Sequence, residues 1–586
     1  MSVTSANMTD RWIGLHAWLG DIAAWLTASH ARALAALVAL ALLCFTPGFF
    51  SIPPVDRDEG RYAQASKQMM ETGDYVDIWF HDDPRHKQPA GIYWMQVASA
   101  TVTGYGTDAP IWVYRLPSLL GATLVVLLTY WIGVTLGGRS VGLMAGAAMA
   151  ACVLLGVEAR LAKTDAMLNA MILIAQGVLA TLYVRAGSGR APPSRGLTPT
   201  GDHAVPLWLA LAFWAACGAG IMIKGPILAL FVVLTIVTLT ILERDIGWLA
   251  PLRPLIGLLV MLAIALPWMV AIGIVTDGAF FAKAVGWNVM GKVVDGHQSH
   301  GAPPGYFSGL VWFTFWPSAL LLAVSLPALW SLRKDRAIRF LLAWIVPAWI
   351  AFEMFATKLP HYVLPTYPAI AILGAIVVLR GASAIDRAWG RALLILSISG
   401  VIIAPVAGLV ALYYFEAAVS VLAILGLVAA IILAAIAFGL VRARHLVAAW
   451  AVSALAMVPV YWSFYQGVVP KVETIWIAPR LAEAVTEAAA CDDPQVLATD
   501  LEEASVIFLI GTDIRFDTAG AAVEFLAEDT DAGTCSVAIV ARGHVDAVRN
   551  GLSERGVDVT EAASVTGLNI GNGRMIDVAV MRRSAP

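Results

Sequence analysis

ALAALVALALLCFTPGFF, residues 33–50, is separated by only five positions from the charged stretch DRDEGRYA, residues 56–63. The first stretch is apolar and close to the roughly 20 residues that a membrane span needs. The second carries three carboxylates and two arginines at the mouth of that span. Because charged groups are costly to bury in lipid, the two stretches together predict a membrane helix that opens into a wet, charged cavity at the membrane surface.

The whole chain repeats this apolar character. Of its 586 residues, 59% are hydrophobic and only 13% are charged, whereas an ordinary soluble domain is about 25% charged. Recurring apolar runs predict an α-helical polytopic membrane protein with about 13 spans. The net charge of -3 and the lack of a long basic tract exclude a nucleic-acid partner. The expected spans are 33–51, 115–135, 140–157, 166–186, 206–222, 226–242, 254–272, 305–328, 337–354, 363–380, 391–413, 419–440 and 446–466.

Basic loops orient these spans. Four connections rich in arginine and lysine, such as the one around 333–339, all fall on one side, which the positive-inside rule makes cytoplasmic. Loops 52–114 and 273–304 and everything after residue 466 then face the periplasm. Residues 1–30 carry three tryptophans among scattered charges, which predicts a helix lying at the interface. Residues 31–466 form the expected transmembrane domain.

The last part of the chain, residues 467–586, changes character. Helix-like stretches at 479–490, 519–528 and 544–554 alternate with short β-rich runs, which predicts a small α/β domain with a mostly parallel sheet. Its Cys491 and Cys535 are either a disulfide, which a non-cytoplasmic location would allow, or two free thiols. No catalytic set is evident in this domain, so it is interpreted as a lid or docking surface. The expected strands are 496–499, 506–510, 536–540 and 575–581.

Charged residues recur beside the outer ends of the spans, on the side where the positive-inside rule disfavours lysine. An anionic ligand would explain these cations, because Lys and Arg bind phosphate through charge-assisted hydrogen bonds. The carboxylates Asp58 and Asp165 lie at the ends of separate spans and could meet, to act as a base or to bind a hydroxyl-rich or cationic substrate. The recurring groups are Asp58 to Tyr62, 86–89, Arg160 to Asp165, Lys224 to Pro226, 297–303 and Lys358 to Tyr362.

The motif Asp58-Glu59-Gly60-Arg61-Tyr62-Ala63 resembles the first-loop motif of lipid-dependent membrane glycosyltransferases of the GT-C type. Within these, the chain is most similar to the aminoarabinose transferases that modify lipid A. The resemblance runs in order through residues 30–375. The further matching stretches are 115–118, 164–165, 224–226, 300–307 and 358–365.

This resemblance implies a GT-C fold and a reaction at the inner membrane. The expected enzyme moves 4-amino-4-deoxy-L-arabinose from undecaprenyl phosphate to a phosphate of lipid A, which would weaken binding of polymyxin and other cationic peptides. A monomer in contact with membrane lipid is expected. Other readings are a protein O-mannosyltransferase, another polyprenyl-phosphate-sugar transferase, or a flippase for a lipid-linked sugar. The flippase is disfavoured, because the charges gather at one face rather than at mid-membrane.

The resemblance also implies roles for single residues. Asp58 is the principal catalytic carboxylate, Asp165 is the second, and Glu59 accompanies them. The expected substrate-binding residues are Arg61, Tyr62, Lys87, Arg160, Lys224, His300, Lys358, His361 and Tyr362.

Plainer explanations exist for each of these residues. Asp58 and Asp165 could cap helices, and the lysines could be interface anchors whose ammonium groups reach the headgroups. His300 could be a loop residue without a task. No cofactor is expected. A divalent metal held by Glu59, His81, His86 or a loop histidine is an alternative that no tight ligand spacing supports.

Overall fold

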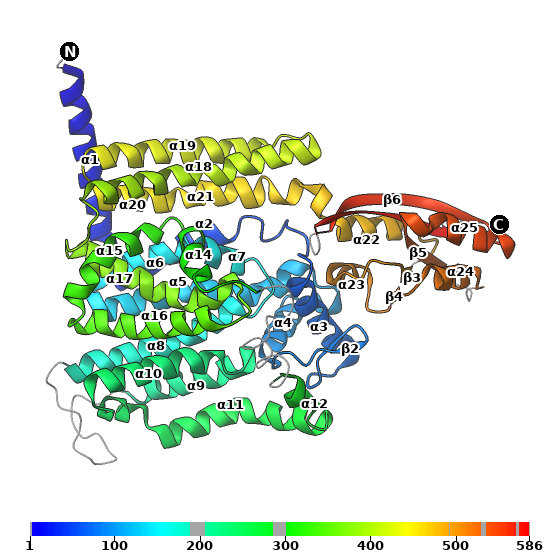
Figure 1. Cartoon of the computed structure of the whole chain (residues 1–586), viewed down its shortest axis with the longest axis horizontal. Helices are drawn as coiled ribbons and strands as arrows, with labels where there is room; N and C mark the ends of the chain where they lie inside the picture. Colours follow the sequence, from blue (N-terminus) through cyan, green and yellow to red (C-terminus); the bar gives the residue numbers. More distant parts are fainter. Residues whose placement is uncertain are drawn as a thin grey trace.

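The structure is a computed structural model that describes residues 3–187, 206–284, 301–491, 493–528, 535–569 and 573–584. It is mostly helical, and its long helices run side by side as a bundle (Figure 1). The C-terminal domain lies at one end of this bundle, which is called the domain end below.

Among the described residues, nine helical segments are long and apolar enough to cross a membrane. The chain is therefore a membrane protein, as expected. Figure 1 shows them lying roughly parallel. They are α5 (Ile111–Gly137), α8 (Asp165–Gly187), α9 (Leu207–Lys224), α11 (Pro254–Val275), α16 (Arg336–Met354), η5 (Pro360–Thr366) with α17 (Tyr367–Leu379), α18 (Ala388–Glu416), α19 (Val421–Arg442), and the segment from α20 (Leu446–Leu455) through α21 (Met457–Tyr461) and η6 (Trp462–Gln466) to Lys471.

The other four expected spans are shorter or broken helices. They are α2 (His30–Phe45), α6 (Arg139–Ala150) followed by α7 (Val153–Glu158), α10 (Ile227–Glu243), and α14 (Tyr306–Thr314) followed by α15 (Ala319–Leu332). The first helix, α1 (Val3–Thr27), makes an angle of 113° with α2. It lies across the end of the bundle opposite the C-terminal domain (Figure 1), a placement that suits the expected interfacial helix.

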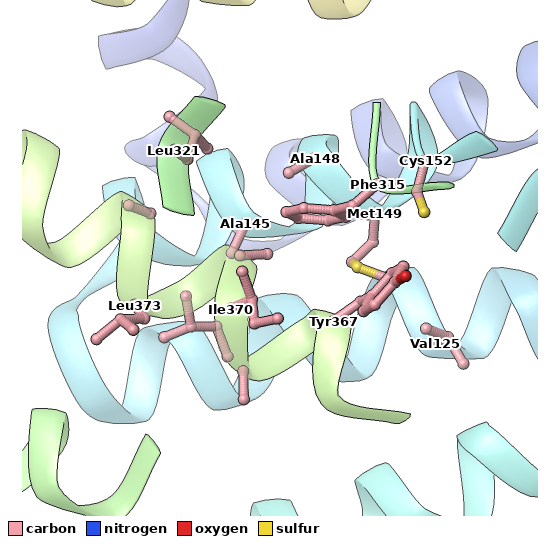
Figure 2. Close-up of a cluster of buried hydrophobic side chains, with 14 of the residues drawn as sticks. Val125, Ala145, Ala148, Met149, Cys152, Phe315, Leu321, Tyr367, Ile370 and Leu373 are labelled. Carbon is pink, nitrogen blue, oxygen red and sulfur yellow. The ribbon is translucent and has the colours of Figure 1, made fainter. Parts of the chain in front are cut away.

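The centre of the bundle is an apolar core. Figure 2 shows side chains from α5, α6, α15 and α17 meeting there, with the rings of Phe315 and Tyr367 beside Met149. The two ring centroids are 5.2 Å apart. The Tyr367 hydroxyl is 2.6 Å from the Thr314 hydroxyl, so its polar tip is satisfied inside the core. This packing fixes the helices whose ends carry the site.

The loop between α2 and α5 forms a small layer at the domain end. It contains α3 (Asp58–Thr72), the paired strands β1 (Trp79–Phe80) and β2 (Asp83–Pro84), α4 (Gly91–Val102) and η1 (Gly106–Asp108). Two short helices, α3 and α4, therefore make up most of this layer. The short helix α12 (Ala279–Phe281) follows α11 at the domain end (Figure 1), whereas η2 (Gly247–Leu252) joins α10 to α11 at the opposite end, where Trp248 packs on Tyr183 of α8.

The C-terminal domain is an α/β domain, but its sheet is mixed rather than mostly parallel. The strand order is β4-β3-β5-β7-β6, with β3 parallel to β4 and β5, and β7 antiparallel to β5 and β6. Its elements are η7 (Val469–Lys471), η8 (Glu473–Ile475), α22 (Ile477–Ala488), β3 (Pro494–Ala498), α23 (Ala504–Ile510), β4 (Arg515–Phe516), α24 (Ala519–Ala527), β5 (Cys535–Ala541), η9 (Arg542–His544), α25 (Val545–Glu554), β6 (Val559–Asn569) and β7 (Arg574–Arg583).

One expected strand of this domain needs correction. Residues 506–510 were expected to be a strand, but they belong to α23, whose apolar side chains pack against α3 and α22. An apolar run of this length does not distinguish a buried strand from a buried helix. Cys491 and Cys535 form a disulfide.

Candidate active site

Helix α3 turns three different faces to its surroundings. Successive residues of a helix point about 100° apart, so neighbours in sequence face different partners. Asp58, Arg61 and Tyr62 share one face by their spacing of three and four residues. Glu59 points into the bundle, and Gly60 lies against the C-terminal domain. One short helix thus connects the candidate site to both parts of the molecule.

Asp58 is an exposed acid at the start of this helix. The cap position belongs to Arg57, no side chain caps the helix, and Asp58 is the first helical residue. The structure therefore does not support the capping role considered for Asp58. In the described part of the chain, no hydrogen bond or ion pair engages its carboxylate, which leaves both oxygens open to a ligand.

Glu59 is placed differently from the catalytic role expected for it. Its side chain is buried, and Arg115 donates Nε to Oε1 and an Nη to Oε2, both at 2.8 Å. The backbone amides of Val55 and Ala162 donate to the same two oxygens, also at 2.8 Å. With four donors on two oxygens, Glu59 ties α3 to α5 and to the segment before Asp165. We therefore correct its role to a structural one.

Asp165 begins α8 and lies at the centre of a buried charge cluster. Its Oδ1 accepts from Lys224 Nζ at 2.5 Å, and His361 Nε2 is 3.7 Å from the same oxygen. Lys163 Nζ is 3.9 Å from Oδ2 and donates to Glu158 Oε1 at 3.1 Å. Asp165, Lys224 and His361, which the sequence predicted separately, therefore meet in one place.

Lys163, one of the two lysines of this cluster, stays charged. Burial disfavours the ammonium of Lys163, but the carboxylates of Glu158, Asp165 and Asp58 outweigh this effect and raise its pKa above the ordinary value. Asp58 thus acts on the same ammonium as Asp165, which places the two acids around a common site. The ring of Tyr362 lies 5.2 Å from that of His361, centroid to centroid, and borders this site as expected.

The same cluster has the geometry of a cation site. One ligand atom each from Glu158, Asp165 and His361 lie within 4.8 Å of one another. However, lysine ammonium groups already bond to Glu158 and Asp165. Such bonds neutralise the carboxylates that a divalent metal would need. The donor set therefore fits an internally balanced ion cluster better than a resident metal.

A second buried group lies beside Tyr62. The Tyr62 hydroxyl donates to the side-chain oxygen of Gln88, and the Arg85 guanidinium lies 4.8 Å from the Tyr62 ring centroid. Arg85 also donates Nε to the Tyr93 hydroxyl at 2.9 Å. Burial raises the pKa of Tyr62 well above its ordinary value, with smaller contributions from Tyr93, Asp58 and Asp165. Tyr62 therefore remains a neutral donor beside both acids.

Several expected binding residues are not placed at this site. Arg160 donates to the carbonyl oxygens of Pro47, Gly156 and Cys44 and lies over the rings of Tyr465 and Tyr461. We correct its role to a structural one, because its guanidinium is buried and bonded on all three nitrogens.

The other expected binding residues are either bonded within the protein, open at the domain end, or outside the described residues. Lys358 is buried and donates to the carbonyls of Ala302 at 2.9 Å and Phe355 at 2.6 Å, so it secures the end of a loop. Lys87 is exposed at the domain end, and Arg61 is half-buried with no ion pair in the described chain. His300, like the loop 285–299, lies outside the described residues.

Four contributors were missed by sequence reasoning. Glu158, Arg85 and Glu503 are isolated polar residues that no motif marks, and the role of Arg115 inside its motif was not assigned. For Arg115 a signal existed, because an arginine inside an apolar run must find an internal partner. Arg85 and Glu158 are recognisable only once the fold brings their partners close.

The C-terminal domain packs directly on α3. A Cβ built on Gly60 would lie 2.9 Å from the backbone of Ala504 and Ser505, so only glycine permits this approach. The Ser505 amide and hydroxyl donate to Asp56 Oδ1 at 3.2 and 3.3 Å. Further along, Gln64 donates to the Thr512 hydroxyl at 2.7 Å. The expectation of a docking surface agrees with these contacts.

Glu503 is an acid from the C-terminal domain at this contact. It is 8% exposed, and its Oε1 has no hydrogen-bond partner in the described chain. Burial, together with the nearby carboxylate of Asp56, raises the pKa of Glu503 to about 7. This domain therefore contributes a titratable group next to the helix that carries Asp58.

Known proteins resemble this chain in sequence. Residues 56–277 match the family described as dolichyl-phosphate-mannose-protein mannosyltransferase. An undecaprenyl phosphate-alpha-4-amino-4-deoxy-L-arabinose arabinosyl transferase of Pseudomonas fluorescens is 28% identical over 395 residues, covering 64% of this chain and 66% of the relative. One of Erwinia tasmaniensis is 28% identical over 319 residues, covering 54% of each chain. The matches thus span between about half and just under two thirds of these relatives' own length.

The structural likeness extends over nearly the whole chain. ArnT from Cupriavidus metallidurans bound to undecaprenyl phosphate has a TM-score of 0.70 and 20% identity, covering 94% of this chain and 98% of that one. Its apo form has a TM-score of 0.67. The predicted GT-C fold and the predicted resemblance are confirmed: the chain has the fold of ArnT, and its sequence is similar to that of the aminoarabinose transferases.

Proposed function

We propose that the protein is a polyprenyl-phosphate-dependent glycosyltransferase that moves 4-amino-4-deoxy-L-arabinose from undecaprenyl phosphate to a phosphate of lipid A. The observation that carries the proposal is the open carboxylate of Asp58 beside the ion cluster of Asp165, Lys224 and His361, at one end of an ArnT-like bundle. The relatives' names supply the sugar and the carrier. The bacterial inner membrane, with the domain end facing the periplasm, is the proposed location, and the disulfide agrees with that side.

The chemistry needs no added base. An oxygen of the acceptor phosphate, already ionised at pH 7, attacks the anomeric carbon of the sugar. The bond from that carbon to the donor phosphate oxygen breaks, and undecaprenyl phosphate leaves with the electron pair. Arg61, which has no ion pair in the described part of the chain, and the exposed Lys87 at the domain end are proposed to stabilise the leaving phosphate.

The acids then have a binding role. Lys163 and Lys224 balance Glu158 and Asp165, so Asp58 is the carboxylate without a counterion in the described cluster. An aminosugar carries an ammonium group, which a nearby carboxylate favours. Asp58 is therefore proposed to orient the donor sugar through its ammonium and to stabilise positive charge that develops at the anomeric carbon.

The mannosyltransferase family match over residues 56–277 supports a second candidate, a transferase that uses a protein hydroxyl as acceptor. Such an acceptor would need Asp58 as a base. Mass spectrometry of lipid A from cells with and without the protein separates the two. An added pentosamine mass only in cells that express the protein supports the first proposal. Unchanged lipid A together with glycosylated protein would favour the second.

Removal of metal ions tests the interpretation that lysines, rather than a divalent metal, neutralise the carboxylates of the ion cluster. Because lysines neutralise Glu158 and Asp165, transfer is expected to be unchanged by EDTA. Loss of transfer that a divalent cation restores would show instead that Glu158, Asp165 and His361 bind that cation.

A further inference from the structure

Arg85 is a buried arginine at the domain end, and it follows directly after β2. Only 7% of its surface is exposed. Its amide donates to the carbonyl of Ile78 at 2.7 Å, and its own carbonyl accepts from the Lys87 amide at 2.8 Å. A bond from a residue to the second one before it closes a tight turn of three residues. The backbone of Arg85 is therefore fixed on both sides.

The guanidinium of Arg85 is bordered by two tyrosines. It lies 4.8 Å from the ring centroid of Tyr62 and donates Nε to the Tyr93 hydroxyl at 2.9 Å. The contact with Tyr62 uses the flat face of the guanidinium, and the bond to Tyr93 uses one of its five N–H donors. In the part of the chain that the structure describes, the two Nη groups of Arg85 have no hydrogen-bond partner.

Arg85 is charged and within electrostatic range of the candidate active site. Burial disfavours its guanidinium, but Tyr93, Tyr62 and Asp58 outweigh burial and raise the pKa of Arg85 above its ordinary value. Among the described residues, no carboxylate forms an ion pair with Arg85. Asp58 therefore acts on Arg85 from a distance and does not neutralise it by contact.

A cation that is more than nine-tenths buried and has unused donors needs an anionic partner. Removing N–H groups from water without new hydrogen bonds is costly, and the two tyrosines are neutral. The Nη groups of a guanidinium form a planar fork that matches two oxygens of a phosphate. A phosphate close to Asp58 would therefore satisfy the donors that the protein leaves open on Arg85.

We propose that Arg85 binds a phosphate group of a lipid substrate through its two Nη groups. This inference rests on the proposed function, in which the anomeric carbon is transferred from the donor phosphate to the acceptor phosphate. Both phosphates then come close to Asp58, and both are phosphate esters carried by a lipid. Arg85 is a substrate-binding residue for one of them, and Tyr62 and Tyr93 orient its guanidinium.

Native mass spectrometry of the full chain in detergent tests the proposal with two pairs of ligands. The pairs are undecaprenyl phosphate with undecaprenol, and lipid A with dephosphorylated lipid A. The wild type should prefer the phosphorylated member of at least one pair. Arg85→Gln should weaken retention of that member about tenfold and leave retention of the phosphate-free member unchanged. Arg85→Lys keeps the charge but lacks the planar fork, so its retention should be intermediate.

Arg480→Gln is the matched control. It removes an arginine of the C-terminal domain that donates to the carbonyl of Thr566 at 2.9 Å, and it should retain ligands as the wild type does. The melting temperature of each variant establishes that it is folded. If Arg85→Gln does not fold, Arg85→Lys decides by the same comparison.

The two pairs of ligands identify the source of the phosphate. Weaker retention of undecaprenyl phosphate assigns Arg85 to the donor, and weaker retention of lipid A assigns it to the acceptor. Unchanged retention of both would overturn the proposal, as would a wild type without preference for phosphate. An equal loss of the phosphate-free ligands would show a packing role and would also overturn it. Because retention requires no sugar transfer, an inactive wild type that retains phosphate through Arg85 would contradict the proposed function but not this contact.

Discussion

At the scale of single residues, three neighbours in α3 have three different tasks. Asp58 is open to the site, Glu59 is buried with Arg115, and Gly60 permits the domain contact. This motif therefore contains one exposed carboxylate, which is proposed to bind ligand, and two residues with structural contacts. Two predictions belong to this scale.

Glu59→Gln is expected to destabilise the protein by about 3–5 kcal/mol, because it leaves the buried guanidinium of Arg115 without its carboxylate. The measurement is the melting temperature in detergent. Glu524→Gln is the control, since that acid is 70% exposed and its pair with Arg555 spans 3.8 Å. A Glu59→Gln variant as stable as the control would contradict the structural role.

The raised pKa of Glu503 predicts that the stability of the domain contact depends on pH. Its pKa is raised from an ordinary 4.5 to about 7, so the folded state holds a proton that the unfolded state releases between these values. The stabilisation that protonated Glu503 gives to the folded state is therefore fully present below about pH 4.5 and is lost as the pH rises through about 7. The effect is on the order of 1 to 3 kcal/mol.

Thermal melting at pH 5.5 and 8.5 measures this effect. The wild type should lose stability with rising pH, and Glu503→Gln, which cannot ionise, should lose less. An identical fall in both proteins would place the responsible group elsewhere.

At the scale of elements, the contact between α3 and α23 couples the C-terminal domain to the site. Gly60→Val should separate the two helices, because its side chain meets the backbone of Ala504 and Ser505. We expect transfer to fall at least tenfold and the contact to become more sensitive to protease. Gly309→Ala in α14 is the control, since nothing lies within 4 Å of its Cβ. Unchanged transfer in Gly60→Val would mean that docking does not matter for activity.

Element prediction from the sequence was limited by context. All 13 apolar runs correspond to helices, because hydropathy reports burial in lipid directly. Residues 506–510 were wrongly expected to be a strand, since they pack as a helix between two other helices. The strand β6 was not predicted, since it alternates small and polar residues at the edge of the sheet. Neither packing partner is visible in the local sequence.

At the scale of the whole molecule, the site could be predicted in outline. Asp165, Lys224, His361 and Tyr362 do lie together, because charges at one end of several spans share the wet face of a bundle. Their roles in binding or catalysis stay predictions. The roles of Arg160, Lys358 and Glu59 could not be predicted. The sequence alone does not distinguish a buried charged residue that bonds to the backbone from one that binds a ligand. The contribution of the C-terminal domain depended on contacts about 450 residues apart.

The disulfide joins the connection between α22 and β3 to the start of β5, across a sequence separation of 44 residues. Closing a loop of this size restricts the unfolded chain, so Cys535→Ser is expected to cost about 3–4 kcal/mol of stability in this domain. The measurement is the melting temperature with and without reductant. Reductant should lower that of the wild type to the level of Cys535→Ser and leave the variant unchanged. A reductant-insensitive wild type would contradict the expected contribution.

The most direct test is transfer by the purified full-length protein in detergent, with an undecaprenyl-phosphate aminoarabinose donor and lipid A. The wild type should form aminoarabinosyl lipid A, and Asp58→Asn should lower turnover at least 100-fold while still binding undecaprenyl phosphate. Near-normal turnover by Asp58→Asn, or no product from the wild type, would contradict a transferase site built around Asp58.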